Sequence, residues 1–132
     1  MQGIERVEAG GQLLACIVRR SFEAPATTFV TPEHTTFQLG FIVYPAAAEI
    51  RRHAHRPLQR SIVGTPEMLM VQRGRCEVDI YGTDGRMIAT KTLEEGDILL
   101  LLAGGHGLRL LDDTVLLEVK QGPYVADEKE LF

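Results

Sequence analysis

The segment "EMLMVQRGRCEVDIYGTDGRMIATKTL" (67–93) decides the fold class of this chain. Its first part, 67–72, is an apolar run that suits a strand. In 75–82 apolar and polar residues alternate one by one, which is typical of a strand with one buried face. The "TDG" at 83–85 is a turn signal, and 86–93 follows as the second strand of a hairpin. The segment therefore predicts antiparallel β structure.

The same pattern continues on both sides of this segment. Short apolar or alternating stretches are separated by turn residues at a spacing of roughly ten residues, as in β-sandwiches and barrels. Further strands are expected at 12–18, 36–44, 98–102, 107–111 and 114–120. The leucine-rich strand at 98–102 is expected to be buried on both faces. The sequence thus predicts a single all-β domain.

Composition and charge exclude several classes of function. A chain of 132 residues with 45% hydrophobic residues suits one globular domain. The net charge of −4 gives no general attraction for nucleic acid. The longest apolar run is too short to span a bilayer, and the first residues lack the features of a signal peptide. We interpret the widely separated Cys16 and Cys76 as reduced thiols. We therefore expect a cytoplasmic protein that binds a small molecule and contacts neither nucleic acid nor membrane.

The segment "EIRRHAHRPL" (49–58) holds two of the four histidines, His53 and His55. If this segment is a strand, the two side chains share one face about 6.5–7 Å apart. Two imidazoles that lean together can then bind one ion at about 2.0–2.1 Å from each nitrogen. The H-x-H spacing therefore suits a metal site. Two exposed histidines on a strand would give the same pattern.

Two more polar residues border predicted apolar faces. Glu67 begins an apolar run and shares a face with Leu69 and Val71, where a carboxylate is costly unless it is paired or bound to a cation. His106 follows a double glycine and shares a face with Leu108. Together with the two histidines, these residues favour a metal site, although Glu67 alone would also suit an exposed strand start.

These residues resemble the two motifs of the cupin superfamily. The first motif is filled by His53, His55, Glu67 and Gly74, and the second by Gly96, Asp97 and His106. The gap of eleven residues between the second histidine and the glutamate is longer than is usual in that family. The resemblance covers residues 36–120 and implies a double-stranded β-helix, the cupin jelly-roll barrel. The implied parts are N-terminal strands or an extension that packs on the barrel, the barrel itself and a C-terminal tail, at 1–35, 36–125 and 126–132.

The resemblance also implies a cofactor and a type of chemistry. One divalent transition metal ion would be held by His53, His55, Glu67 and His106. Iron, manganese, nickel and zinc all suit such ligands. The chain is most similar to small single-domain bacterial cupins, and the activity would be that of a metal-dependent oxygenase or isomerase. Two alternatives stay open: a metal-independent sugar-nucleotide isomerase with His53 and His55 as acid and base, and a non-catalytic binding protein.

Four residues are expected to contact the ligand: Arg51, Gln59, Arg60 and Lys120. Guanidinium groups bind carboxylates and phosphates with two hydrogen bonds, so a small anion such as a carboxylic acid or a sugar derivative is predicted. A solvated basic edge would explain the arginines equally well. Gln59 matches a glutamine near the H-A-H of the sugar-nucleotide isomerases. Lys120 shares a strand face with Glu118, and this face can look inward or outward.

The alternation of residues also predicts a homodimer. If Glu67 faces inward, Met68 and Met70 face outward, and the leucine run at 98–102 presents apolar residues on both faces. A monomer would expose these residues as a patch, and two-fold dimers are the commonest way to cover one. The segment 12–18 could cover part of the patch instead.

Overall fold

The computed structural model describes residues 1–132, which form two compact units. The first, here called the sandwich unit, comprises 1–22 and 65–132, and the second, the insert unit, comprises 23–64. The chain contains strands and no helix, which confirms the all-β prediction. No helix is therefore long and apolar enough to cross a membrane.

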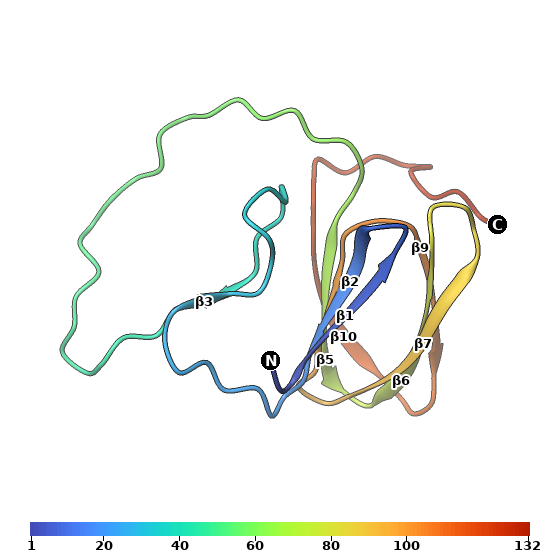
Figure 1. Ribbon diagram of the computed structural model, residues 1–132, viewed down its shortest axis with the longest axis horizontal. Helices are drawn as coiled ribbons and strands as arrows, with labels where there is room; N and C mark the ends of the chain where they lie inside the picture. The colour runs from blue at the N-terminus through green and yellow to red at the C-terminus, as the bar shows by residue number, and fades with distance from the viewer. The chain divides into compact units, whose positions relative to one another are not determined.

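The sandwich unit contains eight strands in two antiparallel sheets (Figure 1). These strands are β1 (Ile4–Ala9), β2 (Gln12–Val18), β5 (Glu67–Arg73), β6 (Arg75–Tyr81), β7 (Met87–Glu94), β8 (Ile98–Leu101), β9 (Gly105–Leu110) and β10 (Val115–Lys120). One sheet has the order β1-β2-β8-β5-β10, and the other has the order β7-β6-β9. The buried core draws on both sheets, as in a β-sandwich. The two sheets do not close into a barrel, and the double-stranded β-helix stays a prediction.

The core between the two sheets follows the predicted alternation. Cys76, Val78 and Ile80 of β6 are fully buried, whereas the residues between them belong to the other face. Leu69 and Val71 of β5 are buried in the same core from the opposite sheet. Each large apolar side chain buried in this way contributes about 1.5–3 kcal/mol to the free energy of unfolding. The hairpin of β6 and β7 is formed as the sequence predicted.

The leucine run of β8 lies in the middle of the five-stranded sheet. Leu99, Leu100 and Leu101 are all buried, so both faces of this strand are covered, as the sequence predicted. The neighbouring β2 pairs with β8 in antiparallel register and is buried from Leu14 to Val18. These two strands form the least exposed part of the sheet.

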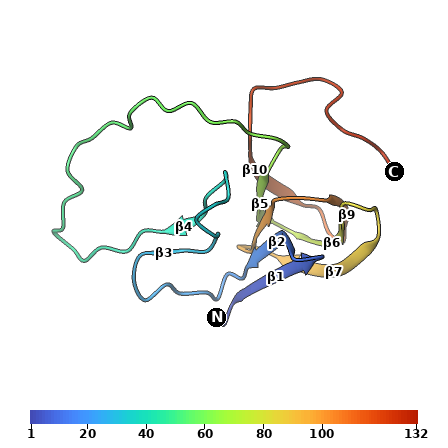
Figure 2. The ribbon, with the colours of Figure 1, turned by 45° about the horizontal axis from the view of Figure 1, so that its top comes forward.

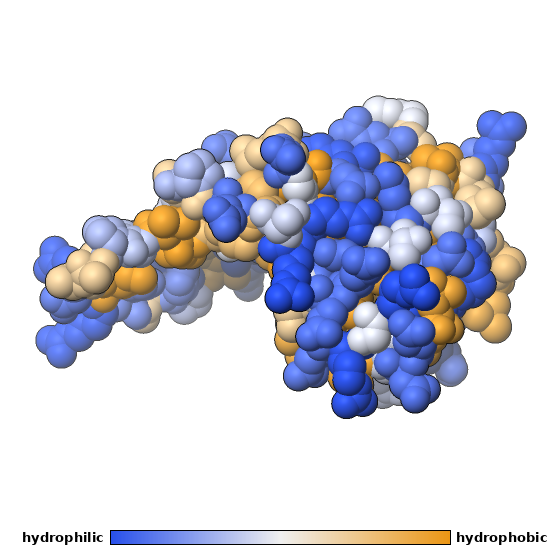
Figure 3. All heavy atoms as spheres, turned by 90° about the horizontal axis from the view of Figure 1, so that it is seen from below, coloured by the Kyte–Doolittle hydropathy of each residue, from blue (hydrophilic) through white to orange (hydrophobic).

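The turns at one end of the sandwich unit explain Gly74. This glycine joins β5 to β6 with a φ of 95°, and a Cβ there would lie 2.4 Å from the carbonyl oxygen of Asp113 in the β9–β10 turn. Only glycine allows this close approach without a backbone shift. Seen from below in Figure 3, the end of the sandwich unit that carries these turns is mostly hydrophilic. The glycine of the first motif thus packs two turns together.

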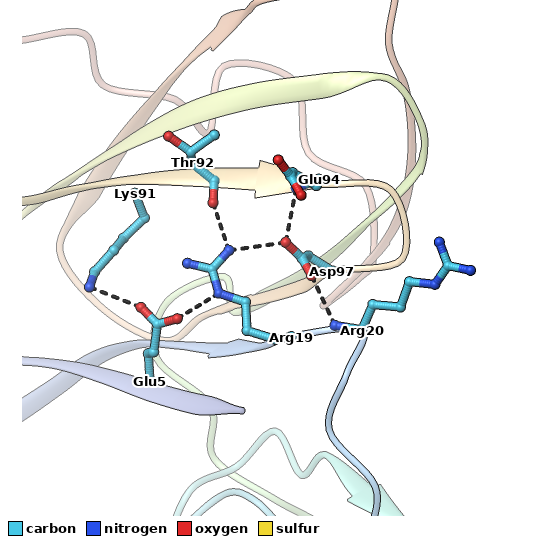
Figure 4. A network of polar contacts seen from close by, with 7 residues as sticks. All are labelled: Glu5, Arg19, Arg20, Lys91, Thr92, Glu94 and Asp97. Atoms are coloured by element: carbon cyan, nitrogen blue, oxygen red, sulfur yellow. Dashed lines mark hydrogen bonds and ion pairs between the residues drawn. The ribbon is translucent and has the colours of Figure 1, made fainter. Parts of the chain in front are cut away.

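The β7–β8 turn is held by the buried carboxylate of Asp97 (Figure 4). It accepts hydrogen bonds from the backbone N–H groups of Arg20 and Glu94, both at 2.9 Å, and from the Arg19 guanidinium at 3.0 Å. Gly96 in the same turn has a φ of 89°, and a Cβ there would lie 2.8 Å from the Arg20 side chain. The Gly-Asp pair of the second motif therefore fixes a tight turn and ties it to the end of β2.

A second carboxylate extends this network. Glu5 of β1 accepts hydrogen bonds from Arg19 at 2.5 Å and from Lys91 at 3.0 Å. The hydrogen bond from Arg19, followed by that from Lys91, lowers the pKa of Glu5 from 4.5 to about 2, against the opposing effect of its burial. The network joins β1, the end of β2 and β7, and so it links the edges of the two sheets (Figure 4).

The insert unit contains only the short strands β3 (Thr28–Phe29) and β4 (Gly40–Phe41), which pair with each other. The predicted strand at 36–44 is therefore wrong except at two residues. Gln38 explains part of the difference, because its side-chain amide donates to the carbonyl oxygens of Pro32 at 2.8 Å and Thr35 at 2.7 Å. These bonds hold the residues before β4 in a local turn and not in a ladder.

Candidate functional site

The sandwich unit brings two of the predicted ligands together. Glu67 is the first residue of β5 in the five-stranded sheet, and His106 is the second residue of β9 in the three-stranded sheet. Oε2 of Glu67 and Nε2 of His106 are 3.9 Å apart. The side chains are 17% and 30% exposed, so solvent or a ligand can reach both. Two residues from different sheets therefore form one partly buried pair.

The strand registers explain why both side chains point between the sheets. Residues that face each other across an antiparallel ladder project to the same side. Glu67 is paired with the buried Leu101, and it lies two residues from the buried Leu69. His106 is paired with the fully buried Ile80. The inward position of Glu67 was predicted from its place in the apolar run, and the structure confirms it.

The distance between the two groups bears on what they can do. At 3.9 Å the imidazole and the carboxylate are too far apart for a hydrogen bond. A transition metal ion binds nitrogen and oxygen at about 2.0–2.2 Å, so two ligands of one tetrahedral ion lie about 3.4 Å apart. The separation of Glu67 and His106 exceeds this value by about half an ångström. A small movement of the two side chains towards each other would bring them to the spacing of two ligands of one ion.

Lys120 extends this site along β10. Its register partner is Glu67, and the partner of Glu118 is the buried Leu69, so both residues of β10 are on the inward face. The register places this strand face on the core side of the sheet, and Glu118 is nevertheless exposed at its end. The Lys120 Nζ atom lies 3.0 Å from a carboxylate oxygen of Glu128 and 3.8 Å from one of Glu118. The hydrogen bond to Glu128 raises the pKa of Lys120, and the charges of Glu128, Glu118 and Glu67 add to this effect.

The H-x-H pair lies in the insert unit, and the strand predicted for it is wrong. His53 and His55 belong to a segment that has no ladder partner and no regular structure. Their rings nevertheless lie close together, with centroids 5.4 Å apart and planes at 64°. Nδ1 of His53 is 2.8 Å from the carbonyl oxygen of Arg51. If Nδ1 carries the proton in this contact, Nε2 is the free nitrogen of His53.

The predicted ligand-binding residues of the insert unit lie in the same segment. Arg51 lines a surface hollow of ≈ 420 Å³ together with Glu49 and Arg52. Gln59 and Arg60 are exposed further along the chain. The hollow is open to solvent, and its three lining residues are all exposed and charged. Arg51, Arg52, Gln59 and Arg60 all lie on the same exposed stretch of chain without regular structure.

A complete metal site is not assembled in this structure. No three side chains of His, Cys, Asp or Glu are grouped so that they could hold one ion. The two pairs of predicted ligands belong to different units, with Glu67 and His106 in the sandwich unit and His53 and His55 in the insert unit. Each pair is formed within its own unit, at 3.9 Å between atoms and 5.4 Å between ring centroids respectively.

Sequence reasoning missed two groups of functional interest. Glu128, which holds Lys120, lies in a tail with no strand or helix pattern, and no spacing rule connects the two residues. Asp79 of β6 accepts hydrogen bonds from Thr90 at 2.7 Å and from the Arg109 guanidinium. These bonds, with that from Arg109 the stronger, lower the pKa of Asp79. The alternation of residues in β6 predicts that the Asp79 side chain lies on the face opposite the core. The neighbouring sequence does not indicate which residues bind it.

Comparison with protein-family models, with curated proteins and with solved structures finds no match to this chain.

Proposed function

We propose that this chain is a metal-binding protein of the cupin type that acts on a small anionic molecule. The observation that carries the proposal is the pair of Glu67 and His106, which come from two different sheets and approach each other to 3.9 Å. Both side chains are partly exposed and no hydrogen bond joins them, so a cation that reaches the pair can bind the carboxylate and the imidazole together. The ion belongs to the divalent transition metals, for which such nitrogen and oxygen ligands are suited.

The remaining ligands are proposed from the sequence pattern. His53 and His55 match the H-x-H of the cupin motif, and their rings lie side by side within the insert unit. This pair is linked to Glu67 and His106 by the sequence motif alone. When bound, the ion would polarise a carbonyl or lower the pKa of a bound water.

The residues of the chain itself bind and orient the anionic molecule in this proposal. Lys120 carries its charge on the inward face of β10, beside Glu67 in the ladder. Arg51 and Arg52 offer two guanidinium groups at the hollow of the insert unit. Each of these cations can hold a carboxylate or phosphate oxygen through charged hydrogen bonds. A carboxylic acid or a sugar derivative is the class of molecule that these groups fit.

Titration of the chelator-treated protein with Co²⁺ tests the proposal, because the absorption of the ion reports nitrogen and oxygen ligands directly. We expect saturation near one ion per chain. His106→Ala and Glu67→Gln should each weaken binding by about tenfold or more, in line with the loss of a metal ligand. His34→Ala is the matched control, because His34 is an exposed histidine of the insert unit outside the proposed ligand set. Equal Co²⁺ affinity of His106→Ala and His34→Ala would show that His106 is not a ligand of the ion.

We also propose that the protein is a homodimer joined through the outer face of β5 and β10. Leu117 and Val119, each 48% exposed, are paired in the ladder with Met70 and Met68. These four residues lie on the face opposite the inward Glu67 and Leu69. β10 is also the edge of the five-stranded sheet. An apolar face at a sheet edge suits a two-fold contact with a second copy of the same strand.

A further inference from the structure

The last eleven residues form a strap across one end of the sandwich unit. Figures 1 and 2 show the chain leaving β10 and crossing towards β9 and β7, at the end where β5 and β9 begin. This segment, 122–132, has no strand or helix. It therefore passes from the five-stranded sheet to the three-stranded sheet, at the end of the unit that holds Glu67 and His106.

Two contacts attach the strap, one to each sheet. On the five-stranded sheet, a carboxylate oxygen of Glu128 lies 3.0 Å from Nζ of Lys120. On the three-stranded sheet, the Phe132 ring meets the Tyr81 ring edge-on, with centroids 5.1 Å apart and planes at 88°. The same ring lies against Gly105, where a Cβ would be only 2.5 Å from it. The strap thus has an ionic attachment and an aromatic one.

The carboxylates around Lys120 differ in how they are held. Glu67 and Glu118 are fixed on the neighbouring ladder positions of β5 and β10. Glu128 is the closest of the three, and it alone belongs to a segment outside the sheets. Its contact is a single ion pair at a partly exposed site, and such pairs are weak and readily exchanged. An external carboxylate can therefore take the position of Glu128 on Lys120 without any change in the two sheets.

We infer that Lys120 is the anchor of a binding site for small carboxylates, and that Glu128 of the strap occupies this anchor as an internal substitute for the ligand. A carboxylate that binds Lys120 displaces Glu128 and releases the strap from the five-stranded sheet. The inference deepens the proposed function, because it names the ligand class and a regulation of the same site. It does not depend on the metal ion, since every contact involved lies in protein side chains of the sandwich unit.

Titration with succinate, followed by NMR on the chelator-treated full chain, tests the inference. Glu128→Gln removes the competing charge and keeps the size of the side chain. If the strap is closed nine-tenths of the time, the variant should bind succinate about tenfold more tightly than the native chain. Glu130→Gln is the matched control, because it removes the same charge from the same segment, and it should bind as the native chain does. Lys120→Met should abolish saturable binding, both alone and together with Glu128→Gln.

Two further readouts make the outcome decisive. Succinamide, which has the size of succinate without its charge, should not bind. The Tyr81 ring signals should shift when succinate saturates the native chain, because the Phe132 ring leaves with the strap. The inference is overturned if Glu128→Gln binds no more tightly than Glu130→Gln, or if the binding survives Lys120→Met. Because the metal has been removed in all samples, a failure here leaves the Co²⁺ result unaffected, and the reverse also holds.

Discussion

The carboxylate of Glu67 and the imidazole of His106 lie 3.9 Å apart although they come from opposite sheets of the sandwich unit. Their approach depends on the position of each residue at the start of its strand and on ladder partners that face the core. The arrangement therefore depends on the sandwich itself, and a change that loosens the sheets should also disturb the pair. The contacts of Asp97, Glu5 and Gly74 hold the strands and turns of the two sheets in place.

Asp97 should be the most sensitive polar residue of the sandwich unit. Asp97→Ala removes three hydrogen bonds to a buried carboxylate and leaves two backbone N–H groups without a partner. We expect the free energy of unfolding to fall by about 2–4 kcal/mol. Asp97→Asn keeps one acceptor oxygen, so its free energy of unfolding should fall by less than that of Asp97→Ala. Urea denaturation followed by circular dichroism measures both, and equal losses for the two variants would show that a single acceptor oxygen preserves none of the stability.

Glu5 should contribute stability that depends on pH. Its pKa is lowered from 4.5 to about 2 in the folded chain, so its contribution is present above pH 4.5 and is lost as the pH falls towards 2. Glu5→Gln should therefore be less stable than the native chain at neutral pH, by up to about 1 kcal/mol for this partly exposed ion pair. The difference should vanish near pH 2. Thermal unfolding between pH 2 and 7 measures it, with Glu8→Gln on the same strand as the control.

Gly74 should tolerate no side chain. Gly74→Ala meets both the cost of a positive φ and a contact with the Asp113 carbonyl oxygen. Gly85→Ala is a matched control, because Gly85 has a similar φ of 83° in open space. The control should lose about 1–2 kcal/mol from the backbone conformation alone, and Gly74→Ala should lose clearly more. Similar losses in urea denaturation would mean that the two turns can move apart freely.

The oligomeric state tests the outer face of β5 and β10. Light scattering at micromolar concentration should give twice the chain mass of 14.6 kDa. Met68→Lys together with Met70→Lys places two charges on the apolar face and should return the mass to that of one chain. Glu77→Lys, on the other sheet, should leave the dimer intact. A native mass near 14.6 kDa would reject the dimer outright.

The sandwich unit could be predicted largely from local patterns. Alternation in 75–82 and the turn at 83–85 specify the β6–β7 hairpin without help from distant residues. Of the β1–β2 hairpin only the second strand, 12–18, is predicted, although Gly10 and Gly11 form the turn, with positive φ angles of 57° and 75°. The two glycines separate apolar stretches in the way that a hairpin requires, so the signal was present in the sequence.

The insert unit shows where local patterns are insufficient. Residues 36–44 have strand-like composition, but strand propensity depends on a partner ladder, and only two residues find one. His53 and His55 have the right spacing for a strand face, yet no ladder forms around them. Their closeness comes from the loop conformation, which spacing alone does not determine. The contact of Lys120 with Glu128 likewise joins a strand to an irregular tail, which no periodic pattern specifies.

Elemental analysis of the freshly purified protein tests the central claim most directly. The account predicts about one divalent transition metal ion per chain, held tightly enough to survive gel filtration, as a site with imidazole and carboxylate ligands should be. It also predicts that the double substitution Glu67→Gln/His106→Ala loses this ion while keeping a native circular dichroism spectrum. A folded native protein with no stoichiometric metal, or a double variant that retains it in full, would contradict the account.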